Sequence, residues 1–411
     1  MSEWKTYMLG NDVVTKLGDG LHGTPIYDDN GEYYFINGSN LVDGNIVINS
    51  NTKKVTEEEF KKYKKDLSDK TILLGINGTI GNVALYNNEL CILGKSAAYL
   101  NINDNFDKQF IRYVLTNNHF QNYIKNNASG TTIKNVGLGL LREYQFSAPK
   151  DKEQQKEIAQ ILTALDDKIE LNLQMNQTLE AMAQALIKEW FVNFNFPNFD
   201  GELENGLPKG WRMGKLGEVV SFVKGVSYRS AELVPSKFAL VTLKSFNRFG
   251  GLNYRGFKEF FGKYKETQVL NEGDVIIAQT DITQAADVIG CPAIVENPLK
   301  YEKLIASIDI VKCVPINTHF SEAVLFYFLY DKRFKDYCLS HTNGSTVLHL
   351  RSSALPNFEF PIPDNELLKQ FTEIINPIRE KIISNNKQIQ TLTQTRDTLL
   401  PKLMSGKLEL V

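Results

Sequence analysis

The stretch DKEQQKEIAQILTALDDKIELNLQMNQTLEAMAQALIKEW, which runs from Asp151 to Trp190, decides the fold of this chain. Neither proline nor glycine interrupts the sequence between Pro149 and Pro197. Asp151 can cap the start of a helix, and Gln154 follows three residues later, as in a capping box. The stretch predicts one helix of about 38 residues, roughly 57 Å long at 1.5 Å per residue. Helices of ordinary globular domains are far shorter.

Apolar side chains recur at steps of three and four along this stretch, which indicates a narrow seam for a second helix. They are Ile158, Ile161, Leu165, Ile169, Leu179, Ala183, Leu186 and Trp190. The pattern returns 213 positions later at Phe371, Ile374, Ile378, Ile382, Leu392, Arg396, Leu399 and Leu403, and only Arg396 departs from it. One copy alone would fit a long core helix equally well, but the repeat predicts two long helices that pair.

The segments that precede the two helices are also related to each other. Trp4 corresponds to Trp211, and Gly130-Thr131-Thr132 corresponds to Gly344-Ser345-Thr346, whereas the middle parts match poorly. A duplicated frame around unlike middles is expected of two modules that share one scaffold and bind different ligands. Strands are predicted where β-branched and aromatic runs alternate with turn residues, and one helix is predicted over Gln109–Lys125. The clearest strand runs are Tyr33–Ile36, Ile46–Ile48, Ile72–Leu74 and Val83–Tyr86.

These patterns predict an α+β chain of five parts. Residues 1–150 form the first module and residues 151–192 the first long helix. Residues 193–206, rich in turn formers and aromatics, form a connector. Residues 207–363 form the second module, and residues 364–411 form the second helix with a C-terminal tail.

Composition narrows the class of protein. No apolar run reaches the 18 residues of a membrane span, and the start of the chain lacks the features of a signal peptide, so we expect a cytoplasmic protein. The four cysteines form no Cys-x-x-Cys pair, and we expect neither a metal nor a cofactor. The net charge is −2, but residues 151–206 carry 4 basic and 11 acidic side chains, while residues 207–363 carry 19 and 15. An excess of basic residues on the globular part and of acidic residues on the helix would suit binding of nucleic acid by the modules.

The order and duplication of these segments resemble the DNA-specificity subunit of type I restriction–modification systems. The resemblance covers the whole chain. It rests on LPKGWRMGKLGEVV, on the turns NGSN and NGTIGNVA, on the module ends SGTTIKNVGLGLLREYQFSAP and NGSTVLHLRSSALPNFEFPIP, and on the helix texts EQQKEIAQILTALDDKIELN and TLLPKLMSGKL. It implies that each module is a target recognition domain for one half of a bipartite site in double-stranded DNA. It also implies that two methyltransferase subunits dock on the chain and that restriction subunits join through them.

The resemblance implies a subunit without catalysis of its own, and the residues agree with that interpretation. An amino-methyltransferase needs an Asn/Asp-Pro-Pro-Tyr/Phe loop, and the chain holds no Pro-Pro pair. Gly94-Lys95-Ser96 is like the tail of a phosphate-binding loop, but Glu89 stands where the first glycine belongs. A coiled-coil structural or adaptor protein with two protein-binding modules remains an alternative, and a fused methyltransferase is a weaker one.

A module that recognises bases needs side chains with hydrogen-bonding edges and cations for phosphates, carried on loops of a rigid sheet. In the first module these are His22, Thr24, Asn37, Ser39, Asn40, Lys53, Lys54, Thr79, Lys95, Ser96 and Thr131. Several of them are also ordinary turn formers. In the second module we select Tyr228, Arg229, Lys244, Asn247, Arg248, Arg255 and Gln279. The stretch Lys244–Arg255, KSFNRFGGLNYR, interleaves basic, amide and aromatic residues around a Gly-Gly turn, as a nucleic-acid-binding loop would.

Two modules on one face of DNA must be held apart, which antiparallel helices achieve. The middle of the first seam is Asn172, and its duplicate is Asn385. If these two asparagines face each other across a pseudo-twofold axis, paired positions sum to 557. The remaining pairs are then all apolar: Ile158 with Leu399, Leu165 with Leu392, Leu179 with Ile378, and Leu186 with Phe371. We expect the acidic positions Asp166, Asp167 and Glu170 to be exposed and to meet a basic methyltransferase surface.

Overall fold

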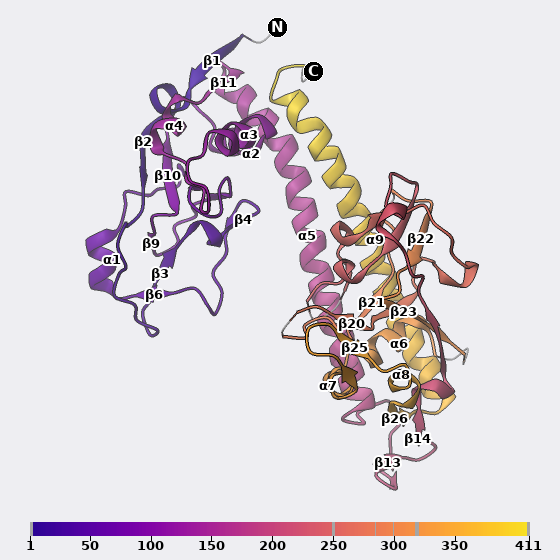
Figure 1. Cartoon of the computed structure of the whole chain (residues 1–411). Coiled ribbons are helices and arrows are strands. Elements are labelled where there is room, and N and C mark those ends of the chain that lie inside the picture. Colours follow the sequence, from indigo (N-terminus) through magenta and orange to yellow (C-terminus); the bar gives the residue numbers. More distant parts are fainter. Residues whose placement is uncertain (1–2, 249–250, 284, 299, 317–319, 409–411) are drawn as a thin grey trace. The chain divides into compact units, whose positions relative to one another are not determined.

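The computed structural model describes residues 3–248, 251–283, 285–298, 300–316 and 320–408. The chain divides into two compact units, one made of Met1–Ile169 with Thr391–Val411 and the other of Glu170–Gln390. Each unit contains one strand-rich module and parts of two long helices, α5 (Lys152–Phe191) and α9 (Asn365–Leu403), drawn in magenta and yellow in Figure 1. The predicted α+β architecture, with a repeated module followed each time by a long helix, is confirmed.

Both long helices begin directly after an aspartate. The Asp151 carboxylate accepts a hydrogen bond from the Glu153 N–H (3.1 Å), and the Asp364 carboxylate accepts one from the Glu366 N–H (3.0 Å). A side-chain oxygen at this position satisfies backbone donors that have no partner in the first turn of a helix. α9 continues through Pro377, so this proline does not end the helix.

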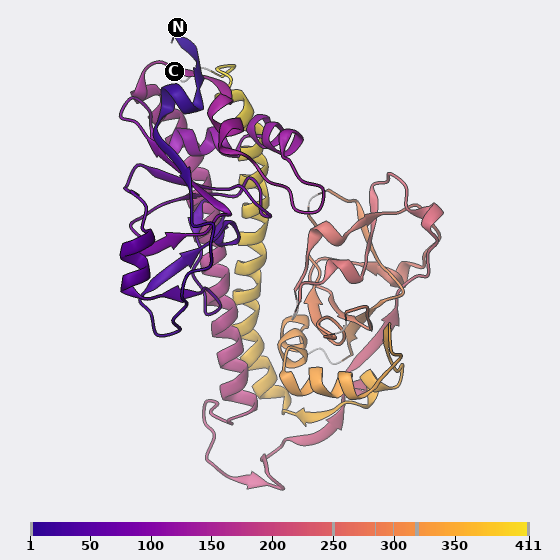
Figure 2. The same cartoon turned by 60° about the vertical axis from the view of Figure 1, so that its left-hand side comes forward.

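The first module combines two sheets with short helices. Its larger sheet has the order β2-β10-β7-β8, a smaller sheet has the order β6-β3-β9, and β1 pairs with β11 and β4 with β5. Figure 2 shows this module in indigo and purple. The elements are β1 Trp4–Met8, β2 Val14–Asp19, β3 Tyr33–Ile36, β4 Leu41–Val42, β5 Asn45–Ile46, β6 Lys54–Val55, α1 Glu57–Tyr63, β7 Thr71–Gly75, β8 Val83–Leu85, β9 Cys91–Leu93, β10 Ala97–Ile102, α2 Lys108–Thr116, α3 Asn118–Asn127, α4 Leu138–Glu143 and β11 Gln145–Pro149.

The second module repeats this plan. The sheet β15-β23-β19-β21 corresponds to the larger sheet, the sheet β17-β16-β22-β18 to the smaller, and the pair β14–β26 to β1–β11. The elements are β12 Leu203–Glu204, β13 Leu207–Pro208, β14 Arg212–Lys215, β15 Val220–Lys224, β16 Phe238–Val241, β17 Lys258–Glu259, β18 Val269–Leu270, β19 Val275–Ala278, β20 Thr280–Asp281, β21 Pro292–Ile294, β22 Lys303–Ala306, β23 Ile310–Pro315, α6 Glu322–Leu329, α7 Lys332–Ser340, β24 Thr342–Asn343, β25 Leu348–Leu350, α8 Ala354–Asn357 and β26 Glu359–Ile362.

Two local predictions need correction. The helix predicted over Gln109–Lys125 is two helices, α2 and α3, because Asn117 takes an extended conformation and its side chain caps α3 at the His119 N–H (3.0 Å). The strand predicted over Ile46–Ile48 is limited to Asn45–Ile46 in β5. In both cases a short polar group satisfied the backbone locally, which apolar periodicity does not reveal.

Each module builds its core together with the long helices. In the first unit Ile158 and Leu162 of α5 and Leu403 of α9 are buried in the same cluster as the sheet residues. In the second unit Trp190 of α5 and Phe371 of α9 join the core of the second module, with ring centroids 5.2 Å apart. Ile161 and Ile374, which the seam pattern included, are exposed instead. No helix in the described part of the chain is long and apolar enough to cross a membrane.

Candidate nucleic-acid interface

Five loops of the first module meet at one place, which we call loop cluster 1 (residues 21–24, 37–40, 77–79, 94–96 and 129–135). A parallel bridge joins Leu21 to Gly94, and antiparallel bridges join Asn135 to both Asn77 and Ser129. The Gly38 N–H donates to Ser96 Oγ at 3.0 Å, which ties the second loop to the fourth. Loops far apart in the sequence therefore form one surface on a sheet scaffold, an arrangement suited to binding.

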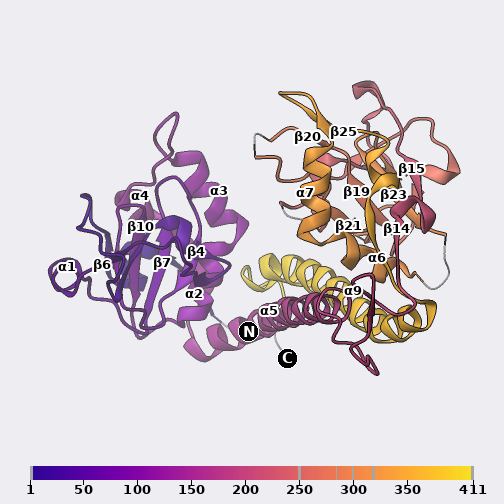
Figure 3. The ribbon, with the colours of Figure 1, turned by 90° about the horizontal axis from the view of Figure 1, so that it is seen from below.

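The second module forms a corresponding loop cluster 2 (residues 226–229, 242–248, 279–281, 307–309 and 342–350). A bridge joins Val226 to Ser307, and the Gln279 N–H donates to the Asp309 carbonyl at 2.9 Å. The Leu350 N–H donates to the Gln279 carbonyl at 2.8 Å, which brings the β24–β25 hairpin to the same place. In Figure 3, β20 and β25 lie at the edge of the second module away from α5 and α9.

The structure brings most of the predicted residues of the first module into loop cluster 1 or beside it. Lys53 and Lys54 lie outside it at β6, with their Nζ atoms each 5.9 Å from the ring centroids of Tyr27 and Tyr34. The exposed predicted residues are His22, Thr24, Ser39, Lys53, Lys95 and Thr131, and the half-buried ones are Asn37, Asn40, Lys54, Thr79 and Ser96.

Three of these half-buried residues hold the turn that carries them. Asn37 Oδ1 accepts from Ser96 Oγ (2.9 Å), and the Asn37 N–H donates to Asn40 Oδ1 (3.0 Å). Asn40 Nδ2 donates in turn to the Val47 carbonyl (3.1 Å). Their polar groups are thus engaged within the module, so the turn interpretation describes Asn37, Asn40 and Ser96 better than direct contact with a ligand.

In the second module, the predicted residues that project freely are cationic. Arg229, Lys244, Arg248 and Arg255 are exposed, and Arg248 makes one long ion pair to Asp287 (3.5 Å). The stretch Lys244–Arg255 closes as a hairpin through the bridge between Phe246 and Leu252, and its residues 249 and 250 lie outside the described residues.

The remaining three predicted residues of this module have structural partners. Asn247 Nδ2 donates to the Leu252 carbonyl at 3.0 Å and supports the same hairpin. Gln279 Nε2 donates to the Ile308 carbonyl, so its amide is committed within the module. Tyr228 is half-buried in an apolar cluster and has Lys258 Nζ 5.8 Å from its ring centroid.

The sequence reasoning missed the hairpin of the second module, residues 342–350, as part of the site. Gly130 in the first module and Gly344 in the second occupy equivalent turns, with φ of +91° and +104°. A Cβ on either glycine would lie within 2.3 Å of a backbone carbonyl oxygen. The matching texts Gly130-Thr131-Thr132 and Gly344-Ser345-Thr346 already pointed to this equivalence. Applying it would have added Ser345, Thr346 and His349, which lie where loop cluster 1 has Thr131 and its neighbours.

The acidic stretch of α5 is only partly free. Asp166 has a side chain that is 16% exposed and pairs with Arg112 (2.6 Å) and with Arg396 (2.9 Å). Tyr113 also donates its hydroxyl to this carboxylate at 2.7 Å. The expectation that Asp166 is exposed is therefore wrong, because its charge is neutralised inside the first unit. Asp167 and Glu170 are exposed.

Charge pairing between α5 and α9 recurs in the second unit. There Glu180 of α5 pairs with Arg379 of α9 at 2.6 Å, and Tyr327 donates its hydroxyl to the same carboxylate at 2.6 Å. Tyr113 and Tyr327 are equivalent in the repeat, 214 positions apart. The acid on α5 thus serves in part to hold each module and α9, rather than to meet an external base.

The helices run antiparallel, as predicted. In the first unit the start of α5 lies beside the end of α9, where Ile158 shares a cluster with Leu399 and Leu403. In the second unit the end of α5 lies beside the start of α9, where Trp190 meets Phe371.

The predicted register is wrong by about one helical turn. Asn172 Nδ2 donates to Gln388 Oε1 (2.7 Å), and Asn385 Nδ2 donates to Asn176 Oδ1 (2.8 Å), so these pairs sum to 560 and 561 instead of 557. Asn172 and Asn385 are buried, with 1% and 2% of their surfaces exposed. Several amides occur along both helices, so more than one register can pair buried amides, and packing decides between them. Of the other predicted pairing residues, Ile158 and Phe371 are buried, and Leu165, Leu179, Leu186, Ile378, Leu392 and Leu399 are half-buried.

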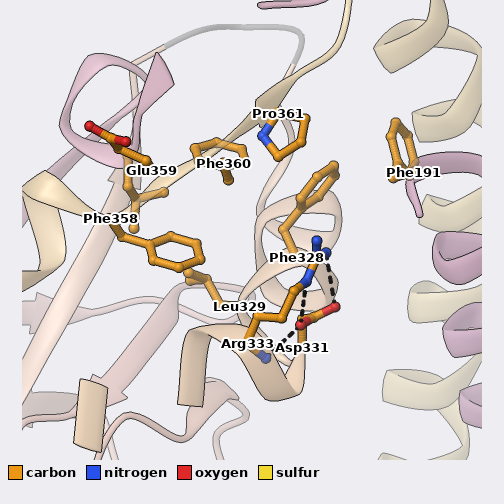
Figure 4. A pocket seen from close by; sticks show the side chains of 10 residues that line it. Phe191, Phe328, Leu329, Asp331, Arg333, Phe358, Glu359, Phe360 and Pro361 are labelled. Atoms are coloured by element: carbon orange, nitrogen blue, oxygen red, sulfur yellow. Dashed lines mark hydrogen bonds and ion pairs between the residues drawn. The ribbon is translucent and has the colours of Figure 1, made fainter. Parts of the chain in front are cut away.

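A small apolar pocket of the second unit lies away from loop cluster 2. Its volume is about 100 Å³, and its lining includes Phe191, Phe328, Phe358 and Phe360 (Figure 4). Arg333 and Asp331 at its edge pair with each other at 3.0 Å. Among the described residues, no group of three or more His, Cys, Asp or Glu side chains is placed to hold a metal ion.

Comparisons with known proteins find a family model and relatives that match this chain. The family described as type I restriction modification DNA specificity domain matches residues 1–181 and 208–394. The chain is 28% identical over 374 residues to the MjaIX type I restriction enzyme specificity subunit of Methanocaldococcus jannaschii, covering 88% of this chain and 83% of that one. It is 26% identical over 473 residues to the HindI specificity subunit of Haemophilus influenzae, covering 99% and 100%.

A solved structure shares the fold. The S subunit of a type I restriction–modification system from M. genitalium superposes with a TM-score of 0.61 at 19% identity, covering 98% of this chain and 96% of that one. The family match includes both modules and most of both long helices. The chain therefore belongs to the type I restriction–modification DNA specificity family, as a specificity subunit.

Proposed function

We propose that this specificity subunit binds a bipartite site in double-stranded DNA, with loop cluster 1 recognising one half-site and loop cluster 2 the other. The observation that carries the proposal is the repeated module, in which corresponding loops gather on corresponding sheets but have different sequences. Two modules with the same scaffold and different loops are suited to recognise two different base sequences. Residues 1–150 and 207–363 would be the two target recognition domains.

The exposed side chains supply the chemistry that DNA binding requires. Arg229, Lys244, Arg248 and Arg255 of the second module are free to contact phosphates or guanine edges. Among the residues selected in the first module, Lys95 and Lys53 are exposed cations, and Thr24, Ser39 and Thr131 are exposed hydroxyl donors. Because phosphate contacts are the same for every sequence, we assign discrimination to the loops that differ between the modules.

The helices offer a docking surface for partners. Asp167 and Glu170 are exposed on α5 and form part of the surface that we assign to methyltransferase subunits. Two such subunits, one for each half-site, would follow from the repeated plan, and restriction subunits would join through them. Because its proposed target is chromosomal and foreign DNA, we place the protein in the cytoplasm.

Titration of the full chain against duplex DNA tests this function. The duplex should carry the bipartite sequence that is methylated in cells expressing the system, and matched duplexes should have one or the other half-site scrambled. We expect specific binding to exceed binding to scrambled DNA by at least about 10³-fold. We also expect the logarithm of the affinity to fall linearly with the logarithm of salt concentration. Equal affinity for all duplexes, with and without a methyltransferase partner, would contradict the proposal.

A further inference from the structure

A tyrosine of the predicted recognition loop in the second module donates a hydrogen bond to a buried carboxylate. Tyr254 starts the short helical turn Tyr254–Gly256, directly before the exposed Arg255, and its hydroxyl donates to Glu296 Oε2 at 2.6 Å. Glu296 is buried, at 8% exposure. Burial, followed by the charge of Glu296, raises the pKa of Tyr254, so its hydroxyl stays protonated and remains a donor.

The Glu296 carboxylate also accepts hydrogen bonds from a residue of α9. Asn386 Nδ2 donates to both oxygens of Glu296, at 3.1 and 2.9 Å, and Asn386 Oδ1 accepts from Asn176 Nδ2 of α5 at 2.7 Å. Arg379 Nη2 lies 3.7 Å from Glu296 Oε1 and pairs through Nη1 with Glu180 of α5. A continuous chain of polar contacts thus joins the loop to both long helices.

The first module has a counterpart made of different residues. Its β4–β5 turn contains Gly44, with φ of +88°, where a Cβ would lie 3.1 Å from the guanidinium carbon of Arg112. Arg112 pairs with Asp166 of α5, which pairs in turn with Arg396 of α9. In both modules, therefore, the loop that follows the first strand of the smaller sheet lies against a largely buried charged side chain that interacts with α5 and α9.

We infer that Tyr254 and Glu296 are positioning residues for specificity: they fix the loop that carries Arg255 against the long helices, so that this loop can discriminate bases of one half-site. The inference rests on the proposed DNA-binding function. A hydrogen bond to a buried carboxylate is short and directional, and it holds the turn where apolar packing alone would leave it free to shift. Base readout depends on such placement, whereas phosphate attraction tolerates small shifts.

Binding of the full chain with Tyr254→Phe to three duplexes tests this inference. The duplexes carry the complete site, a scrambled first half-site or a scrambled second half-site, with the half-site of the second module identified beforehand by exchanging residues 207–363. We expect the discrimination for that half-site to fall roughly 10-fold, the size associated with losing one charge-assisted hydrogen bond. Discrimination for the other half-site and the salt dependence should stay unchanged.

Three further variants separate positioning from general loss of structure. Tyr301→Phe removes a hydroxyl from a ring that packs on the same apolar cluster, and it should leave discrimination unchanged. Glu296→Gln keeps an acceptor for Tyr254 and should retain more discrimination than Glu296→Ala. Asn386→Ala breaks the contact from the helix side and should act on the same half-site as Tyr254→Phe.

The outcomes distinguish this inference from the proposed function. If the unaltered chain shows no discrimination between duplexes, the DNA-binding function itself fails. If it discriminates and Tyr254→Phe does so equally well, Tyr254 does not position the loop. An equal loss for both half-sites would also overturn the inference, because a contact confined to the second module would then be acting only on the stability of the chain.

Discussion

Replacing Asp166 with asparagine should destabilise the first unit. The carboxylate binds Arg112, Arg396 and the Tyr113 hydroxyl, and it is the shared acceptor between the first module, α5 and α9. Arg112 is only 13% exposed, so its charge cannot return to water when its partner is neutralised. Arg396 is 30% exposed and can be rehydrated more easily.

The magnitude follows from these exposures. Removing one partner of a fully buried ion pair costs about 3–5 kcal/mol, and partial rehydration of Arg396 with retention of one amide acceptor lowers this to about 2–3 kcal/mol. With a urea dependence of about 2–3 kcal/mol per M, the unfolding midpoint of the first unit should fall by about 1 M. Hydrogen-exchange mass spectrometry along a urea series would measure this unfolding midpoint on peptides of α2.

A matched control is the neighbouring exposed residue. Asp167→Asn removes the same charge from the same turn of α5 without touching Arg112 or Arg396, and the midpoint should move by no more than about 0.2 M. Peptides of α6 and α7 in the second unit should be unaffected by either change. If both aspartate variants lowered the midpoint of α2 equally, the effect would come from the charge of the helix and not from the buried contacts.

Three other results are expected. Arg248→Ala should weaken binding by about 1–3 kcal/mol and relax one base position if Arg248 contacts a base, or lower the salt slope by about one if it contacts phosphate; no change in either would remove it from the DNA surface. Asn176→Cys combined with Asn385→Cys should cross-link under mild oxidation, whereas Asn172→Cys combined with Asn385→Cys should cross-link more slowly, and the reverse order would restore the register that sums to 557. Burial alone would raise the pKa of Asp281, but hydrogen bonds from backbone N–H groups of its own loop outweigh burial and lower this pKa. The stability that Asp281 contributes should therefore be complete above the unfolded pKa of about 3.9 and be lost as pH falls through the lower folded pKa. An acid titration in which the Asp281→Asn variant unfolds at the same pH as the unaltered chain would contradict this.

Repetition made the architecture accessible from the sequence. The seam positions repeated at a constant offset, and a few landmark residues of the module ends repeated in the same order, so two modules and two long helices followed without knowledge of any contact. Arg396 was the one break in the apolar repeat, and it is the residue that pairs with Asp166. A polar residue on a seam thus indicated a specific partner, which the periodicity could not name.

The site was less accessible because polar residues in loops serve two purposes. Asn37, Ser96 and Gln279 have the side chains that base readout requires, and the structure uses them to close turns and join loops. Asp166 has the composition of a solvated helix face, but Arg112 covers it from 54 positions away in the sequence. Such pairings depend on the tertiary fold, and no local pattern distinguishes them from exposed residues.

Exchange of one module tests the central claim most directly. Residues 1–150 should be replaced with the corresponding module of a different specificity subunit, and the methylated sites in cells carrying the complete system should be mapped. Two independent recognition modules predict that one half-site changes to that of the donor while the other half-site stays the same. A change in both half-sites, or in neither, would contradict the account.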